Sequence, residues 1–149
     1  MNSPVDINIE ILKHAKDLPI PSYQTAGAAG IDLFAALTEP MEMYPLERVL
    51  IPTGLKISLP PDMEAQIRPR SGISYKYGIT VLNSPGTIDS DFRGEIKIIL
   101  INLSQDNFIV EHGARIAQMI ISPVTKARLN LVSMVDETKR GSKGFGSTG

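Results

Sequence analysis

The residues best suited to chemistry lie at positions 83–96, in the stretch Asn-Ser-Pro-Gly-Thr-Ile-Asp-Ser-Asp-Phe-Arg-Gly-Glu-Ile. Two aspartates, a glutamate, an aromatic ring and an arginine are crowded there, and a carboxylate in such a loop can act as a general base. Because alternate residues of an extended segment share a face, Asp89 and Asp91 are expected to point one way and Ser90 and Phe92 the other.

The elements that must position this stretch are the apolar runs on either side of it, at residues 79–82 and 96–103. Pro85 and Gly86 favour a tight reversal between the two runs. We therefore expect a hairpin of two strands that presents a pocket.

Other polar residues with chemical potential are scattered along the chain. Asp32 is the only carboxylate in the apolar run 31–37, Arg70 lies in an Arg-Pro-Arg-Ser-Gly sequence, and Gln118 lies in a mostly apolar segment. Each has a plain alternative role, as a turn cap, a surface ion pair or a strand-edge donor. Together with the acidic hairpin they offer a base and phosphate donors, as the hydrolysis of a nucleotide polyphosphate requires.

Two further patterns have little functional weight. His14 and His112 stand alone without metal-ligand spacing, so each is interpreted as a surface or packing residue. The glycines at 144, 146 and 149 match G-x-G-x-x-G, but no predicted strand precedes them and no helix follows.

Short segments of alternating or apolar residues, separated by turn signals, indicate an all-β sandwich, jelly roll or barrel. The expected strands lie at residues 5–11, 31–37, 55–59, 63–67, 79–82, 96–103, 108–110 and 114–121, with Leu129, Leu131 and Val135 closing the series. Only residues 71–78 lack the alternation and favour a helical turn.

Composition restricts the possible functions. The chain has 149 residues, is 42% hydrophobic and lacks cysteine, which indicates one domain without disulfides or thiolate chemistry. The absence of cysteine fits a reducing compartment, and neither a leader nor a membrane span is expected, so we predict the cytoplasm. A net charge of −1 gives no reason to expect direct nucleic-acid binding.

The composition changes at residue 136, after which the chain is rich in glycine and basic residues. Such a segment buries too little apolar surface to order itself. We expect a β domain at 1–135 and a tail at 136–149 that stays mobile until a ligand binds.

Five segments taken in order carry a family resemblance. Residues 26–33, 68–73, 86–95, 113–118 and 140–148 resemble the five motifs of the homotrimeric dUTPases, the deoxyuridine 5′-triphosphate nucleotidohydrolases. The resemblance implies a jelly-roll-like β subunit, a homotrimer with active sites between subunits, and a tail that closes over the site of another subunit. It also implies hydrolysis of dUTP to dUMP and pyrophosphate with Mg²⁺.

The resemblance gives individual residues their roles. Asp89 matches the general base that activates a water, and Asp32 matches an aspartate that supports the metal indirectly, through water. The remaining matches contact substrate: Arg70, Ser71, Gly72 and Gln118 at the phosphates, Asn83, Gly86, Thr87 and Ile88 at uracil, and Arg140, Phe145, Gly146, Ser147 and Thr148 from the tail.

Phe92 departs from the family pattern, because tyrosine is usual at this position. The ring that packs under deoxyribose is retained and its hydroxyl is lost. Two other functions remain open at this point: a dCTP deaminase of the same superfamily, and a catalytically silent trimer that binds nucleotide or a protein partner.

Overall fold

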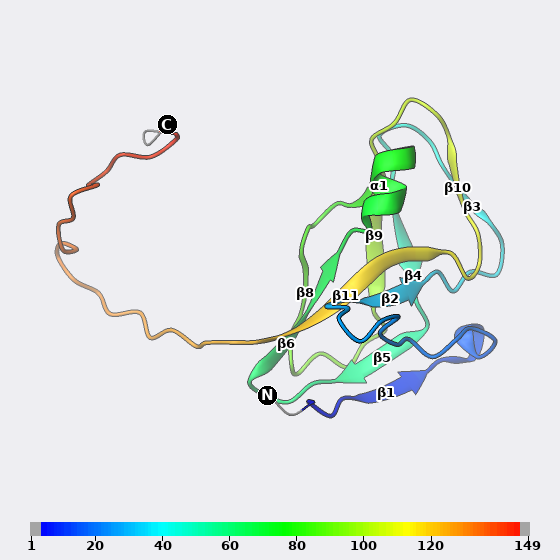
Figure 1. Ribbon diagram of the computed structural model, residues 1–149, viewed down its shortest axis with the longest axis horizontal. Coiled ribbons are helices and arrows are strands. Elements are labelled where there is room, and N and C mark those ends of the chain that lie inside the picture. Colours follow the sequence, from blue (N-terminus) through cyan, green and yellow to red (C-terminus); the bar gives the residue numbers. More distant parts are fainter. Residues whose placement is uncertain (1–3, 147–149) are drawn as a thin grey trace.

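The computed structural model describes residues 4–146, and its regular elements are short strands and little helix (Figure 1). The strands are β1 (Asn8–Ile11), β2 (Ile31–Phe34), β3 (Met41–Met43), β4 (Arg48–Pro52), β5 (Leu55–Ser58), β6 (Met63–Arg68), β7 (Ile79–Val81), β8 (Gly86–Ile88), β9 (Lys97–Asn102), β10 (Phe108–Val110) and β11 (Arg115–Pro123). The helices are a 3-10 turn, η1 (Lys13–Ala15), and α1 (Ser71–Tyr77). The predicted all-β class is confirmed.

Antiparallel pairing organises these strands into a jelly-roll-like fold. The largest sheet has the order β2-β11-β6-β8, and a second sheet has the order β4-β9-β7. Two smaller pairs, β1-β5 and β10-β3, complete the body. The order is non-consecutive throughout, so segments distant in sequence meet in every sheet.

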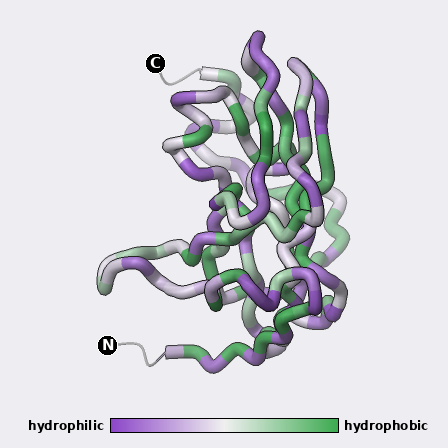
Figure 2. The backbone as a smooth tube through the Cα atoms, turned by 90° about the vertical axis from the view of Figure 1, so that its right-hand side faces the viewer, coloured by the Kyte–Doolittle hydropathy of each residue, from purple (hydrophilic) through white to green (hydrophobic). Residues whose placement is uncertain are grey.

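The core follows from the strand periodicity. Inner positions of β5 (Leu55, Ile57) and β9 (Ile98, Leu100) are buried and belong to one hydrophobic cluster. Each such side chain contributes about 1.5–3 kcal/mol on burial. Hydrophobic and hydrophilic residues alternate along the tube in Figure 2, as two-faced strands require.

The helix predicted at 71–78 is confirmed as α1. Gly78 follows its last residue: the Gly78 N–H donates to the Ser74 carbonyl at 3.0 Å, and the φ of 66° at Gly78 then turns the chain out of the helix. In the part of the chain that the structure describes, no helix is long and apolar enough to cross a membrane.

The two runs flanking the acidic stretch pair as predicted, with Val81 opposite Leu100 in β7 and β9. The connection is longer than a tight reversal, however. Residues 86–88 form β8, which pairs with β6 in the other sheet, with Gly86 opposite Ile67. The acidic stretch therefore crosses between the two sheets.

The strand expected around Leu129–Val135 is wrong for the single chain. Leu129 and Leu131 are 93% and 102% exposed, and this part of the chain runs away from the body (Figure 1). Val124 donates to the carbonyl of Asp62 at 2.8 Å, just before the chain departs. An alternating pattern shows that a segment can pair, but it does not show that its partner lies in the same chain.

Candidate active site

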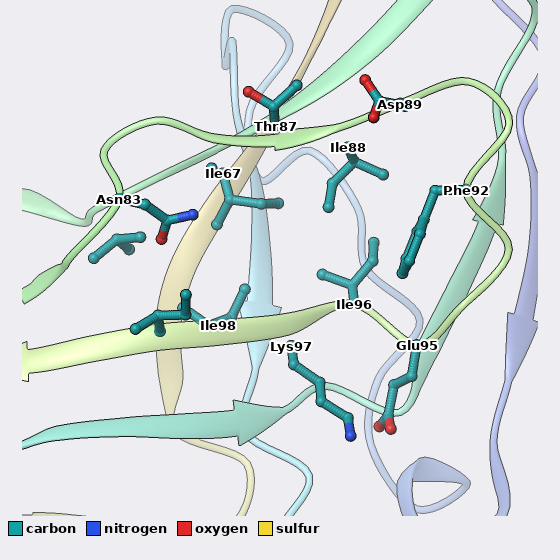
Figure 3. Close-up of a pocket in the computed structure, with 13 residues that line it drawn as sticks. Ile67, Asn83, Thr87, Ile88, Asp89, Phe92, Glu95, Ile96, Lys97 and Ile98 are labelled. Carbon is teal, nitrogen blue, oxygen red and sulfur yellow. The ribbon is translucent and has the colours of Figure 1, made fainter.

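A cavity of about 290 Å³ lies between β8 and the start of β9. Six of the predicted site residues line it: Asn83, Gly86, Thr87, Ile88, Asp89 and Phe92. Figure 3 shows Asn83 on one side and the Phe92 ring on the other, with Ile96 and Ile98 between them. A flat ligand with a polar edge fits a cavity of this kind, whose wall combines apolar and polar side chains.

The predicted division of the acidic loop into two faces is wrong. Asp89 and Phe92 line the same cavity, while Ser90 points its hydroxyl toward the carbonyl of Pro61 at 3.5 Å. The reason is a turn: the Phe92 N–H donates to the Asp89 carbonyl at 3.2 Å, so the segment is not extended and the alternation fails.

The turn is held by Arg93 and by a close approach at Gly94. The Arg93 guanidinium donates to the carbonyls of Ser90 and Phe92 at 2.7 and 2.8 Å. A Cβ at Gly94 would lie 2.6 Å from Cζ of Phe92, so the ring rests directly on the glycine backbone. The position of the ring therefore depends on the position of the backbone at residue 94.

Asp32 forms the centre of a second polar cluster. Its Oδ1 accepts from Arg70 Nε at 2.9 Å, and its Oδ2 lies 3.6 Å from an Arg115 guanidinium nitrogen. Arg70 also donates to the Arg115 carbonyl at 3.2 Å. The Asp32 carboxylate is only 16% exposed, so it holds both guanidinium groups in place.

Gln118 extends this cluster along the sheet. It is opposite Asp32 on β2 and Arg68 on β6, and its amide donates to the Pro69 carbonyl at 2.9 Å. Ser71 and Gly72 are exposed at the start of α1, directly after Arg70. The four predicted phosphate-binding residues are therefore near one another, beside Asp32.

The two sets of residues lie in different parts of the same sheet, with the cavity beside β8 and the Asp32 cluster on β2 and β11. Ile67 and Met119 point inward to the core, and Ile67 lines the cavity, whereas their neighbours Arg68 and Gln118 point outward. Within residues 4–146, no hydrogen bond or ion pair joins the Asp32 cluster to the cavity. The structure brings the predicted site together as two halves.

The described tail residues join neither half. Phe145 is fully exposed, and Arg140 donates only to the Lys143 carbonyl at 2.9 Å. Gly146 has a φ of 83° with open space around it. Ser147 and Thr148, also predicted to bind substrate, lie outside the described residues.

Two site residues were missed by the sequence interpretation. Arg115 contacts Asp32 and stacks 5.8 Å over the Phe34 ring, and the signal for it was a lone cation at the start of an apolar strand. Glu95 lines the cavity and pairs with His14 at 2.6 Å. Their separation of 81 positions gave no local signal.

Comparisons with known proteins identify the family. The family model described as dUTPase matches residues 16–149 of this chain. The chain belongs to the dUTPase family. The deoxyuridine 5'-triphosphate nucleotidohydrolase of Methylocella silvestris is 52% identical, covering 100% of this chain and 94% of that protein.

Solved structures share the dUTPase fold. The Staphylococcus bacteriophage 80alpha dUTPase with dUpNHpp has a TM-score of 0.86 at 26% identity, covering 97% of this chain and 98% of that one. A variant dUTPase from phage phi11 of S. aureus, described as coordinating a structural Mg(II) ion, has a TM-score of 0.78 at 20% identity, covering 89% and 99%.

Proposed function

We propose that this chain is a dUTP diphosphatase, which hydrolyses dUTP to dUMP and pyrophosphate. The observation that carries the proposal is the position of Asp89, which lines the cavity together with Asn83 and Phe92 and points its carboxylate away from the apolar side chains there (Figure 3). The name of the 52% identical relative supports the same reaction. The product dUMP is a precursor for dTMP, and removal of dUTP keeps uracil out of DNA.

The cavity is suited to the nucleoside part of the substrate. Uracil presents carbonyl and imide groups along one edge, which the Asn83 amide and the backbone of residues 86–88 can read. The Phe92 ring offers an apolar face to the deoxyribose. A cavity of about 290 Å³ leaves the triphosphate outside, toward Asp89 and solvent.

Asp89 is the proposed general base. Its carboxylate accepts a proton from a water whose oxygen forms a bond to the α-phosphorus. The bond between that phosphorus and the oxygen bridging to the β-phosphorus breaks, and pyrophosphate leaves. The water is consumed and no other reactant is required.

The remaining site residues would come from other copies of the chain in a homotrimer. Within the described residues, no hydrogen bond or ion pair joins Arg70, Ser71, Gly72 or Gln118 to the cavity, so the Asp32 cluster of one copy can serve the cavity of a neighbour. Guanidinium and amide donors suit phosphate oxygens. The tail, with Arg140, Phe145, Gly146, Ser147 and Thr148, would close the site and exclude water.

Mg²⁺ is the proposed metal. Across residues 4–146, no three His, Cys, Asp or Glu side chains are grouped to hold a metal by themselves. That donor set fits Mg²⁺, which keeps several waters and takes substrate phosphate oxygens, with Asp32 acting through water because two guanidinium groups face its oxygens. When bound, the ion neutralises charge on the leaving pyrophosphate.

The test is incubation of the chain with Mg²⁺ and, separately, dUTP, dCTP, dTTP and UTP, with pyrophosphate and ammonia both measured. We expect pyrophosphate from dUTP and its loss on chelation of Mg²⁺. Ammonia from dCTP would instead identify a deaminase, and binding without turnover would identify a silent nucleotide-binding trimer. We also propose a cytoplasmic location, which fractionation of the source cells tests.

A further inference from the structure

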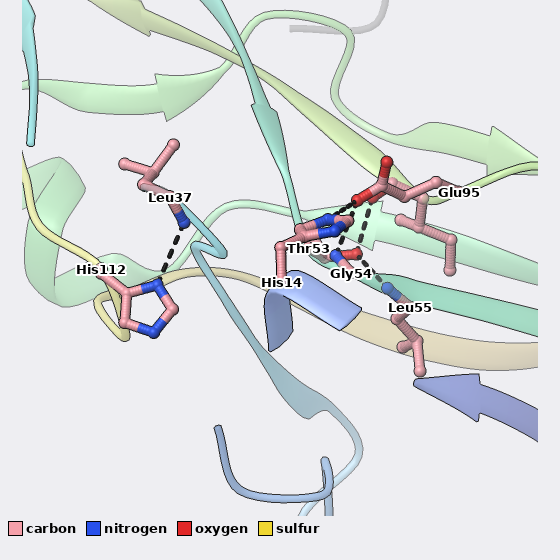
Figure 4. Close-up of polar contacts among 8 residues, drawn as sticks. His14, Leu37, Thr53, Gly54, Leu55, Glu95 and His112 are labelled. Atoms are coloured by element: carbon pink, nitrogen blue, oxygen red, sulfur yellow. Dashed lines mark hydrogen bonds and ion pairs between the residues drawn. The ribbon is translucent and has the colours of Figure 1, made fainter. Parts of the chain in front are cut away.

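Glu95 is the most heavily bonded acid beside the cavity. Its Oε1 accepts from the Gly54 N–H at 2.9 Å and contacts Nε2 of His14 at 2.6 Å (Figure 4). The Glu95 side chain is only 15% exposed, against 35% for that of His14. Nε2–H can donate in the neutral tautomer and in the imidazolium alike, so the contact does not require a charged histidine.

These contacts fix the end of the Phe92 loop from two directions. The Ile96 carbonyl accepts from the Thr53 hydroxyl at 2.6 Å, and the Ile96 N–H donates to the Leu55 carbonyl at 2.8 Å. Gly54, between them, has a φ of 64° and a Cβ position 2.2 Å from Cβ of Ala15. The turn carrying Gly54 therefore lies directly against η1, which carries His14.

The same backbone determines where the Phe92 ring lies. The ring rests on Gly94, and Gly94 is bonded directly to Glu95. A shift of Glu95 would move the surface under the ring, and the ring forms one side of the cavity (Figure 3). His14 itself does not line that cavity, so it can act there only through Glu95.

We propose that His14 is a positioning residue of the enzyme: through Glu95 it fixes the loop that carries Phe92, and so sets the fit of the sugar. This inference rests on the proposed dUTP hydrolysis. His14 makes no contact with substrate, and its contribution is to hold the loop in the shape that the deoxyribose requires before binding.

The kinetic test compares His14→Ala, His14→Gln and the unaltered chain with dUTP and UTP. We expect His14→Ala to raise KM for dUTP about three- to tenfold and to lower the preference for dUTP over UTP similarly, with kcat changed less than about twofold. Gln can donate to Glu95 through its amide and should restore most of the loss. An unchanged KM and preference in His14→Ala would overturn the proposal.

His112→Ala is the matched control. His112 Nε2 pairs with the Asp17 carboxylate at 2.9 Å, so this variant also removes one histidine–carboxylate pair, but away from the cavity. We expect its dUTP-over-UTP preference to equal that of the unaltered chain. An equal loss of preference in both variants would show a general effect of stability and would overturn the inference.

Hydrogen exchange tests the loop without any turnover. His14→Ala should raise amide exchange in residues 90–97 several-fold, while His14→Gln should leave it near the original rate. If His14→Ala does not fold, His14→Leu provides the second variant, because it fills the place of the ring but offers no donor to Glu95. Unchanged exchange in a folded variant that lacks the donor at residue 14 would overturn the inference. Failure of the unaltered chain to hydrolyse dUTP would overturn the proposed function and with it the role in sugar fit, while the exchange data would still show whether His14 holds the loop.

Discussion

Asp32 and Gln118 stand directly opposite each other on β2 and β11, on the outer face of the main sheet. The Gln118 side chain lies so close to Gly30 that a Cβ there would fall 2.3 Å from its Oε1. The absence of a side chain at Gly30 therefore leaves room for the Gln118 amide beside Arg70 and Asp32. This packing leads to the first prediction.

Gly30→Ala should displace the Gln118 amide and lower kcat/KM for dUTP by about 10- to 100-fold, because a hydrogen bond to a charged phosphate is lost. The obstructing atom is the end of a flexible side chain, so the melting temperature should change little. Gly27→Ala is the control, since nothing lies within 4 Å of a Cβ there. Equal activities for the two variants would contradict the assigned role of Gln118.

Asp89→Asn should keep the fold and the binding of dUTP, but lower kcat by about 10²–10⁴-fold, because the amide cannot accept a proton from water. Single-turnover kinetics together with equilibrium binding separate these effects. Asp91→Asn is the matched control, as Asp91 does not line the cavity. A rate near that of the unaltered chain for Asp89→Asn would exclude Asp89 as the base.

The sequence predicted what local patterns encode. Alternation located β5 and β6, and its absence located α1, because each element leaves its own period in the chain. The third motif, together with Asn83, also predicted six of the residues that line the cavity. The turn from Asp89 to Phe92 was missed. A backbone hydrogen bond between residues three positions apart changes the direction in which the side chains point, and the residue types do not reveal it.

Contacts between segments that are distant in the chain could not be predicted from the sequence. The pairing of His14 with Glu95 joins positions 81 apart, and Arg115 reaches Asp32 only because β2 and β11 are neighbours in the sheet. The exposed Leu129 and Leu131 show the same limit, since an apolar pattern does not identify its partner. These contacts depend on the order of the strands in the sheets, and the residue periodicity of a single segment carries no information about that order.

Asp17 should give the protein an acid-sensitive contribution to stability. The hydrogen bond from His112 Nε2–H to its carboxylate lowers the pKa of Asp17 below the ordinary 3.8. A lowered carboxyl pKa stabilises the folded state above pH 3.8, and this stabilisation is lost as the pH falls through the lower folded-state value. Melting temperatures of Asp17→Asn and the unaltered chain should therefore differ near neutral pH and converge in acid.

The double variant with His112→Ala checks the cause of that difference. If the hydrogen bond is responsible, Asp17→Asn should have no further effect on the melting temperature once His112 is absent. A difference that persists at low pH, or one that survives in the His112→Ala background, would assign the effect to another contact.

Deletion of the residues after Thr138 should lower kcat/KM for dUTP by about 10²-fold or more, because Arg140 and Phe145 are lost and the site stays open to water. The assembly should be unchanged, since the described residues of this segment make no bond to the body. Sizing and the pyrophosphate assay measure the two expectations separately. Full activity of the shortened chain would remove the tail from the site.

Mixing two inactive variants tests whether one site draws on two copies of the chain. Asp89→Asn disables the cavity, and Arg70→Ala disables the Asp32 cluster, which has no bond to the cavity within the described residues. If the two halves meet across a subunit contact, unfolding and refolding an equal mixture should restore about one quarter of the sites by random assembly. Each variant refolded alone should stay inactive.

The control mixture pairs Arg70→Ala with Gln118→Ala, which disable the same half of the site. Both residues lie in the Asp32 cluster. Every copy in this mixture carries one of the two changes, so no copy has an intact Asp32 cluster. Recovery should therefore be absent in this mixture. If the Asp89→Asn and Arg70→Ala mixture also fails to recover, while sizing shows a mixed trimer, the two halves act within one chain and the proposed subunit arrangement is wrong.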